Sequence, residues 1–188
     1  MAMPTPVHEQ DWTVDRALAL PDDGNRYEVL DGELFVTPAP TWTHQRAIGV
    51  LFPRLNEYVR AHRLGWAMLS PADITFSPRR LVQPDIFVVP WREGGTPSGW
   101  TDVKHLLLAI EVLSPSTARA DRYRKRAIYQ DQGVPEYWIV DPAARIVERW
   151  RPNETEPEIL VDLFEWRPRG DAPACTLALG AFFDEVNG

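Results

Sequence analysis

The sequence predicts an α/β fold with a mixed central β-sheet flanked by helices, preceded by an N-terminal β-hairpin and followed by a C-terminal β-meander. Three observations support this class. Short apolar runs typical of strands alternate with two longer segments of helical periodicity. An Asp-Gly pair joins two alternating runs near the N-terminus, as in a tight hairpin. The 188 residues are 44% hydrophobic and 25% charged, which suffices to bury a sizeable core.

The first predicted element is a β-hairpin over Tyr27–Val36, because two alternating runs flank the turn signal Asp31-Gly32. Side chains alternate between the two faces of a strand, so a two-residue turn places Glu28 and Glu33 on the same hairpin face. The other face is expected to point toward the core, and it carries Tyr27, Val29, Leu34 and Val36.

A helix is predicted over Thr43–Arg63, where apolar residues recur at helical spacing. Either Thr41 or Thr43 is placed to cap its start. Pro53 lies inside the pattern and is expected to kink the helix or to mark a break near its first turns.

Three strands are predicted to follow this helix. The last two are short apolar runs that each contain one carboxylate, and a glycine- and proline-rich segment over Pro90–Thr101 separates them as an exposed loop. The three strands cover Gly65–Phe76 (interrupted by Pro71), Leu81–Val89 and Leu106–Leu113.

A second helix is predicted from Ser114 to about Gln132, where Gly133 ends it. Alternating apolar stretches then predict further strands before an apolar tail. These strands cover Glu136–Asp141, Arg145–Trp150 and Glu158–Phe164.

Length and composition bound the organisation and the function classes. We expect one domain over residues 1–188, with an N-terminal extension (1–25), a core (26–150) and C-terminal strands and tail (151–188). The net charge of −7 and the pI near 5.1 exclude a protein that coats nucleic acid by bulk positive charge, but not a nuclease, whose metal site is itself acidic. The single cysteine, Cys175, excludes internal disulfides and indicates a reducing, cytoplasmic setting, where we interpret it as a packing residue. No apolar run approaches the roughly 20 residues of a membrane helix, so no membrane partner is expected.

Two carboxylates interrupt the apolar strands. Asp85 and Glu111 lie inside runs where an unpaired charge is costly. Each residue alone is explained by a strand end or by an ion pair with one of the many arginines. Both together, on strands that follow each other in the chain, favour a metal site.

Lys125 is an informative cation because lysine is rare in this chain. Only Lys104 and Lys125 are lysines, so 18 of the 20 basic residues are arginines. At about 100° per residue, Lys125 shares a helix stripe with Asp121 and Ile128 that is expected to face the sheet. An ordinary Asp121–Lys125 pair at a helix edge is the alternative. A site that places a small cation beside a reacting oxygen would, however, reject the wider arginine.

Several short motifs occur here in a specific order and spacing. They are Tyr27–Glu33, His44-Gln45, Gln83–Asp85, Glu111–Thr117, Asp121 with Lys125 and Tyr129, and Gly133–Asp141. Pro84-Asp85, 26 residues before Glu111, resembles the PD-(D/E)XK nuclease superfamily. The fuller set, over about residues 12–150, is similar to a bacterial restriction endonuclease family long catalogued as a domain of unknown function. The superfamily's lysine would stand at position 113, which is Leu113 here, and Lys125 matches a branch in which that lysine has migrated to the following helix.

The resemblance implies a restriction-endonuclease-like core with a site for magnesium or manganese. Asp85 and Glu111 would bind the divalent ion, helped by the main-chain carbonyl of Val112. Glu33 would reach in from the hairpin as a third carboxylate, and Glu28 is the reserve candidate on the same face.

The resemblance also implies a catalytic role for Lys125, which would orient or deprotonate the attacking water or stabilise the charged transition state. Asp121 and Tyr129 are supporting candidates on the same helix, and Tyr129 would orient a phosphate or the lysine. His44 invites a catalytic interpretation, although a lone histidine at a helix start is more often a structural hydrogen-bonding residue.

The function that this resemblance implies is metal-dependent hydrolysis of DNA phosphodiester bonds, with DNA as the partner. Two alternatives stay open: a catalytically inactive nuclease-fold module for binding or assembly, and an enzyme that acts on another phosphorylated or nucleotide substrate. Trp91 and Trp100 flank the glycine-rich loop and would either stack on bases or anchor the loop. The acidic balance requires a homodimer or a local basic patch to hold long duplex DNA, and the expected patch comprises Arg119, Arg122, Arg124 and Arg126.

Overall fold

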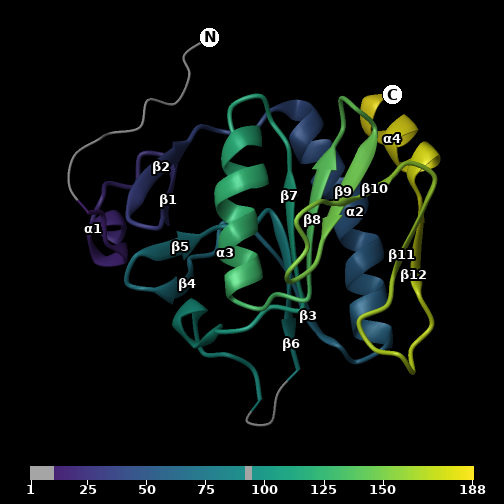
Figure 1. Ribbon diagram of the computed structural model, residues 1–188, viewed down its shortest axis with the longest axis horizontal. Helices are drawn as coiled ribbons and strands as arrows, with labels where there is room; N and C mark the ends of the chain where they lie inside the picture. The colour runs from purple at the N-terminus through teal and green to yellow at the C-terminus, as the bar shows by residue number, and fades with distance from the viewer. Residues whose placement is uncertain (1–10, 92–94) are drawn as a thin grey trace.

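A six-stranded mixed sheet lies at the centre of the computed structural model and separates two hydrophobic cores (Figure 1). The structure describes residues 11–91 and 95–188. Helices α2 (Trp42–Ala61) and α4 (Leu179–Asn187) pack on one face of the sheet, and α3 (Arg126–Asp131) covers the other. This arrangement confirms the predicted α/β class with a mixed central sheet.

The main sheet has the strand order β10-β9-β8-β7-β6-β3. Strands β7 and β8 are parallel, and every other neighbouring pair is antiparallel. All five residues of β7 are buried, as expected for a central strand that is covered on both faces. The strands are β3 (Gly65–Leu69), β6 (Ile86–Pro90), β7 (Leu108–Val112), β8 (Glu136–Asp141), β9 (Ile146–Trp150) and β10 (Glu158–Leu160).

The predicted N-terminal hairpin is confirmed and belongs to a second sheet. Asp31 and Gly32 have φ values of 55° and 87°, as a tight two-residue turn requires, and the predicted Leu30–Glu33 pairing is present. The second sheet has the order β2-β1-β5-β4. Its strands are β1 (Arg26–Leu30), β2 (Glu33–Thr37), β4 (Ile74–Ser77) and β5 (Arg80–Val82).

The predicted core face of this hairpin is wrong in part. Leu30 and Phe35, from the face that carries Glu28, pack into the core beneath α3. The predicted face contributes Val29 and Leu34 only to a small cluster with α1 (Val14–Leu18), while Val36 is exposed. The prediction was wrong because it placed the face with the glutamates toward solvent. Glu28 on that face is buried, and Lys125 from a segment far along the chain neutralises its charge.

The strand predicted over Leu81–Val89 is two strands in two different sheets. β5 ends at Val82 in the smaller sheet, and β6 begins at Ile86 in the main sheet. Pro84 lies in the crossing and has no N–H for a ladder, so neither sheet continues through it. Asp85 therefore stands at the junction between the two sheets. The strand predicted over Gly65–Phe76 is likewise divided, into β3 and β4.

Helix α2 closely matches its prediction. The Thr41 side chain accepts a hydrogen bond from the main-chain N–H of His44, so Thr41 rather than Thr43 is the N-cap. The helix continues through Pro53 without a break. Its buried stripe comprises His44, Ala47, Leu51, Leu55, Tyr58 and Val59.

The predicted second helix begins later than Ser114 and is not α-helical throughout. A π-helical segment covers Ala120–Lys125 and leads directly into α3. A π-helical stretch adds a residue to the turn and is frequent at functional sites. It brings both Asp121 and Lys125 into the interior.

The expected C-terminal meander is present over β8, β9 and β10, and the chain differs from the prediction only after β10. β10 joins the main sheet, whereas β11 (Leu163–Trp166) pairs with β12 (Cys175–Ala178) in a separate two-stranded sheet. Cys175 packs against the core beneath α2, in line with its interpretation as a packing residue. The tail then forms α4, which the sequence analysis missed, although its apolar residues recur at helical spacing. Its buried residues are Leu179, Phe182, Phe183 and Val186.

The loop expected over Pro90–Thr101 lies partly outside the described residues, since 92–94 are not among them. A short 3-10 helix at Trp100–Asp102 closes it. In the described ranges, none of the helices is long and apolar enough to cross a membrane.

Candidate functional site

A buried group of ionisable side chains lies where the two sheets and the π-helical segment meet. β1 contributes Glu28, Asp85 stands just before β6, and Glu111 lies in β7. The π-helical segment contributes Asp121 and Lys125. Each of these side chains belongs to a residue that is at most 3% exposed. We refer to the five residues as the carboxylate–lysine cluster.

Lys125 lies among three carboxylates of this cluster. Its Nζ is 2.9 Å from Glu28 Oε2 and 3.1 Å from Glu111 Oε1. A third contact of 3.3 Å joins Nζ to Asp121 Oδ1, four residues earlier in the chain. Burial by itself lowers the pKa of Lys125, but the carboxylates outweigh it and raise that pKa well above its usual value. The ammonium group is therefore charged at neutral pH.

The Asp85 carboxylate is held in place by three neighbouring groups. Arg26 Nη1 donates to Oδ1 at 2.9 Å, while Oδ2 lies 2.9 Å from His44 Nε2. The main-chain N–H of Val112 donates to Oδ2 at 2.8 Å, which ties Asp85 to β7. Burial raises the pKa of Asp85, but His44, Arg26 and the Val112 N–H together lower it to about 2. Asp85 is thus an ionised carboxylate with a fixed orientation.

Glu111 has the opposite electrostatic setting. Its Oε1 accepts a hydrogen bond of 3.2 Å from the Tyr129 hydroxyl and also contacts Lys125. Burial raises the pKa of Glu111 well above its usual value, and the charges of Asp85 and Asp121 add to this effect. Burial likewise raises the pKa of Asp121. Neighbouring carboxylates whose pKa values are pushed apart in this way are typical of functional sites.

The structure therefore brings most of the predicted site residues together. Asp85, Glu111 and Lys125 share one buried cluster, and Asp121 contacts Lys125 as an ion-pair partner. Two supporting candidates contact the cluster as well: Tyr129 through Glu111, and His44 through Asp85. Val112, predicted as a metal ligand through its main-chain carbonyl, contacts Asp85 through its N–H instead, so its role as a ligand stays a prediction.

Glu33, the preferred third carboxylate, is not part of the cluster. Its side chain is 41% exposed and pairs with Arg124 at 3.1 Å. Glu33 lies at the turn end of the edge strand β2, whereas Glu28 lies on β1 between β2 and β5. The reserve candidate Glu28 is therefore the hairpin glutamate that reaches Lys125, and it also accepts a hydrogen bond from the main-chain N–H of Gln83 at 2.7 Å.

The sequence analysis missed Arg26 as a member of this site. Arg26 begins β1 and shares the Glu28 face, since the two residues are two positions apart on the strand. The predicted hairpin began at Tyr27. One further pair, the observed Arg26–Thr37 pairing, would have placed Arg26 near the predicted strands that carry Asp85 and Glu111.

A cavity of about 20 Å³ adjoins Lys125, which is room for about one water molecule. Phe35, Thr37 and Pro38 line one side of it, and Ser116 lies on the other. The cavity thus opens between the end of β2 and the start of the helical segment, next to Glu28 and Asp121.

The arginine patch expected on the second helix is largely neutralised. Arg122 pairs with Asp141 and Glu148, and Arg124 pairs with Glu33. Arg126 lies over the Trp150 ring and bonds to Gln130, and within the described residues only Arg119 of the four has no recorded side-chain partner. This helix therefore does not offer the free basic surface that the sequence suggested.

The donor chemistry of the cluster suits a hard divalent cation. Its carboxyl groups are Glu28, Asp85, Glu111 and Asp121, whereas the permanent cations that touch them are Arg26 and Lys125, so the carboxyl groups outnumber the cations. Among the residues that the structure describes, no three His, Cys, Asp or Glu side chains converge in a ligating arrangement. Magnesium is usually held by only one or two carboxylates together with waters and substrate phosphates, so the absence of such a group of three does not decide whether the cluster holds a metal.

Comparisons with known proteins agree with the resemblance drawn from the motifs. The family model described as "Uma2: Putative restriction endonuclease" matches residues 14–179. A crystal structure described as a putative nuclease belonging to DUF820 from Anabaena variabilis ATCC 29413 is similar, with a TM-score of 0.75 and 22% sequence identity. The similarity covers 93% of this chain and 99% of that chain, which confirms the fold class. None of the curated proteins matches the chain.

Proposed function

Because this chain belongs to the Uma2 family, we propose that it is a metal-dependent endonuclease that hydrolyses DNA phosphodiester bonds. The observation that carries the proposal is the buried contact of Lys125 with Glu111, beside the ionised Asp85. A structural ion pair requires only one partner of each sign. Here the carboxylates outnumber the permanent cations inside the protein, so protons on the carboxyls with raised pKa, or a further cation in their place, must balance the charge.

Asp85 and Glu111 would hold a magnesium or manganese ion, and Glu28 is the third carboxylate at the site. When bound, such an ion polarises the phosphate and lowers the pKa of the attacking water. Arg26 and His44 position Asp85, because each contacts one of its two oxygens at 2.9 Å. Tyr129 orients Glu111 through its hydroxyl.

Lys125 acts as a fixed positive charge in this proposal. Its raised pKa keeps the ammonium protonated near neutral pH, so the role of general base is disfavoured. The charge instead stabilises the negative charge that develops on the phosphate oxygens in the transition state. The neighbouring cavity of about 20 Å³ has room for the attacking water.

Purified protein incubated with supercoiled, linear and single-stranded DNA, with and without magnesium or manganese, tests this proposal. We expect metal-dependent cleavage that Asp85→Asn and Glu111→Gln each reduce by about 10²-fold or more. Glu33→Gln is the matched control, because Glu33 is exposed and lies outside the cluster.

Two other outcomes would overturn the proposal. A folded protein that binds DNA but never cleaves it would be an inactive nuclease-fold module. A protein that hydrolyses nucleotides or another phosphorylated substrate, and leaves all DNA forms intact, would be an enzyme of a different substrate class.

A further inference from the structure

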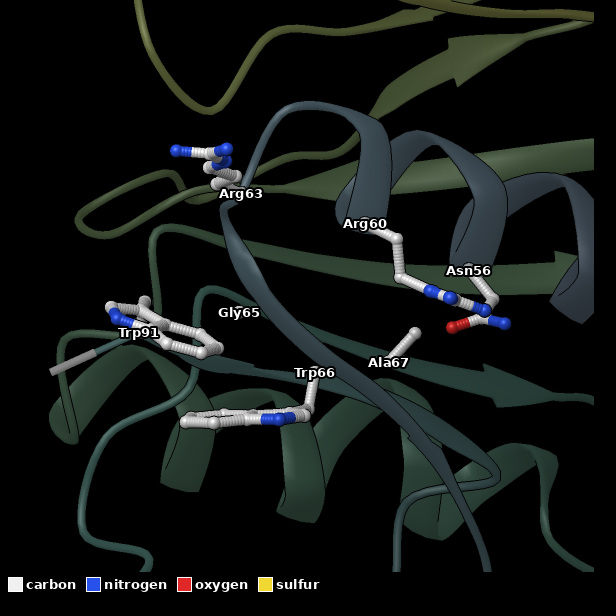
Figure 2. Close-up of a pocket in the computed structure, with 7 residues that line it drawn as sticks. All are labelled: Asn56, Arg60, Arg63, Gly65, Trp66, Ala67 and Trp91. Atoms are coloured by element: carbon white, nitrogen blue, oxygen red, sulfur yellow. The ribbon is translucent and has the colours of Figure 1, made fainter. Parts of the chain in front are cut away.

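A second and larger pocket lies at the open edge of the main sheet, away from the carboxylate–lysine cluster. Its volume is about 560 Å³. It is formed where α2 ends and the edge strand β3 begins, and the end of β6 borders it. Figure 2 shows the two indole rings at one end and Arg60 with Asn56 at the other. The lining residues are Asn56, Arg60, Arg63, Gly65, Trp66, Ala67 and Trp91.

The two tryptophans form an accessible aromatic platform. The rings of Trp66 and Trp91 are stacked, with centroids 4.5 Å apart and planes inclined by 22°. Trp91 is 60% exposed, which is unusual for so large an apolar side chain. Gly65 permits this arrangement, because a Cβ at that position would lie 1.9 Å from the Val89 carbonyl oxygen and would push β3 away from β6.

Two arginines on the same pocket have no carboxylate partner among the residues that the structure describes. Elsewhere in this acidic protein arginines repeatedly pair with carboxylates, as Arg54 of α2 does with Glu185 at 3.0 Å. No ion pair or side-chain hydrogen bond is recorded for Arg60 or Arg63 within residues 11–91 and 95–188. Arg63 also has a φ of 50° at the end of α2, where glycine is the usual residue. An arginine at this position indicates a use for its side chain.

We propose that this pocket is a subsite for a single-stranded nucleic acid segment. A base stacks on the exposed face of Trp91, and the guanidinium groups of Arg60 and Arg63 contact the flanking phosphates. Stacking platforms combined with cations are the usual means of holding single strands without sequence readout. A peptide strand added to β3 would use the open sheet edge but would leave both arginines without a partner.

The position of the pocket connects it to the cluster. Asp85 and Trp91 lie at opposite ends of β6, six residues apart, which corresponds to roughly 20 Å along a strand. A nucleic acid strand that is several nucleotides long spans that distance. The inference rests on the proposed function for the identity of its ligand, but binding at the pocket can be measured without any cleavage.

The test is the fluorescence anisotropy of a labelled six-nucleotide dT oligomer, titrated with the full chain in the presence of EDTA. We expect Trp91→Leu to weaken binding by roughly tenfold or more, because leucine keeps the apolar volume but has no π face. Trp91→Phe should restore most of the affinity. Arg60→Ala with Arg63→Ala should reduce the slope of log K against log salt by about 0.7 for each arginine. Arg54→Ala is the matched control on the same helix and should bind as the wild type does.

Three results would overturn the inference. The first is unchanged oligomer binding by Trp91→Leu. The second is equal affinity for dTMP or for a duplex of the same length, which would indicate a mononucleotide or duplex site. The third is loss of a homodimer in Trp91→Leu together with no oligomer binding by the wild type, which would make this sheet edge a protein interface. A wild type that binds the oligomer through Trp91 and cleaves no DNA would leave the subsite intact and refute only the nuclease proposal.

Discussion

Lys125 contacts three carboxylates with one ammonium group, and this geometry explains why a lysine stands there in a chain that otherwise favours arginine. An ammonium has three donors on a compact centre, so each N–H can face one carboxylate. A guanidinium is planar and wide, so it cannot face three carboxylates in the same way at a site where Lys125 is 3% exposed. The rarity of lysine was thus a usable signal in the sequence.

We expect Lys125→Arg to keep its fold and to lose cleavage by about 10²-fold or more, because the larger group moves Glu111 and Glu28 out of position. Manganese-dependent nicking of supercoiled DNA and the melting temperature measure the two effects. Lys104→Arg is the control, since Lys104 is exposed and outside the cluster, and it should be nearly silent. Full activity of Lys125→Arg would show that Lys125 contributes no more than a charge.

Asp85 should make stability depend on pH in the acid range. Its folded pKa of about 2 lies below the ordinary value of 3.8, so its contribution is present above about pH 4 and is lost as the pH falls through 2. The size of this contribution is roughly 2 kcal/mol. In EDTA, the difference in unfolding free energy between wild type and Asp85→Asn should shrink by about two thirds of that amount between pH 5 and pH 2.5. Urea unfolding at several pH values measures it, and a constant difference would contradict the assignment.

Among the elements, those set by local signals were predicted correctly from the sequence. The Asp31-Gly32 turn fixed the hairpin register, and the apolar stripe of α2 fixed its length. The division of Leu81–Val89 between two sheets was not predictable from its apolar pattern, because the whole segment is buried and no change of pattern marks the break. Pro84 in that segment was the one signal of a break, because proline has no N–H to donate in a continuous strand ladder.

The candidate site was predictable to the same extent. Asp85 and Glu111 each interrupt an apolar run, so the sequence identified each of them individually as a candidate. The choice between Glu28 and Glu33 could not be predicted from the sequence, because both lie on one hairpin face. Only the packing of the π-helical segment decides which glutamate contacts Lys125. No sequence period indicated the π-helical segment, since it differs from an α-helix by a single added residue.

Helix α2 depends on Thr41 for its first turn, which also places His44 against Asp85. We expect Thr41→Ala to lower the free energy of unfolding by about 1 kcal/mol, because the main-chain N–H of His44 loses its hydrogen-bond acceptor. Denaturant unfolding measures this change. Thr43→Ala is the matched control, because Thr43 lies inside the helix and does not cap it, and an equal loss from both would mean that capping is not the cause.

At the scale of the whole molecule, the net charge of −7 is not spread evenly over the surface. Part of the negative charge is buried in the cluster, and surface carboxylates are paired with arginines such as Arg54 and Arg149. Arg60 and Arg63 at the β3 edge, which have no carboxylate partner in the described part of the chain, are therefore a local positive surface on an acidic protein. An acidic protein can in this way present a local surface for a polyanion.

The buried excess of carboxylates predicts that divalent metal stabilises the whole fold. A ligand that binds only the folded state at 100 times its Kd adds about 2.7 kcal/mol, which for a chain of this size raises Tm by roughly 5–10 °C. Because the pKa of Glu111 is raised, metal binding displaces a proton, and the rise in Tm should increase as the pH increases. Thermal melts with magnesium or manganese, against EDTA, measure it at two pH values.

Two matched glutamate variants locate the source of that stabilisation. Glu28→Gln removes a buried carboxylate that contacts Lys125, so the metal-dependent rise in Tm should fall. Glu33→Gln makes the same chemical change on the same hairpin face, but its side chain is exposed and pairs with Arg124, so the rise should persist. Asp85→Asn should abolish the rise, since Asp85 is one of the two proposed ligands. An equal rise in wild type, Asp85→Asn and Glu28→Gln would place the metal elsewhere on the molecule and remove the main support for catalysis at this cluster.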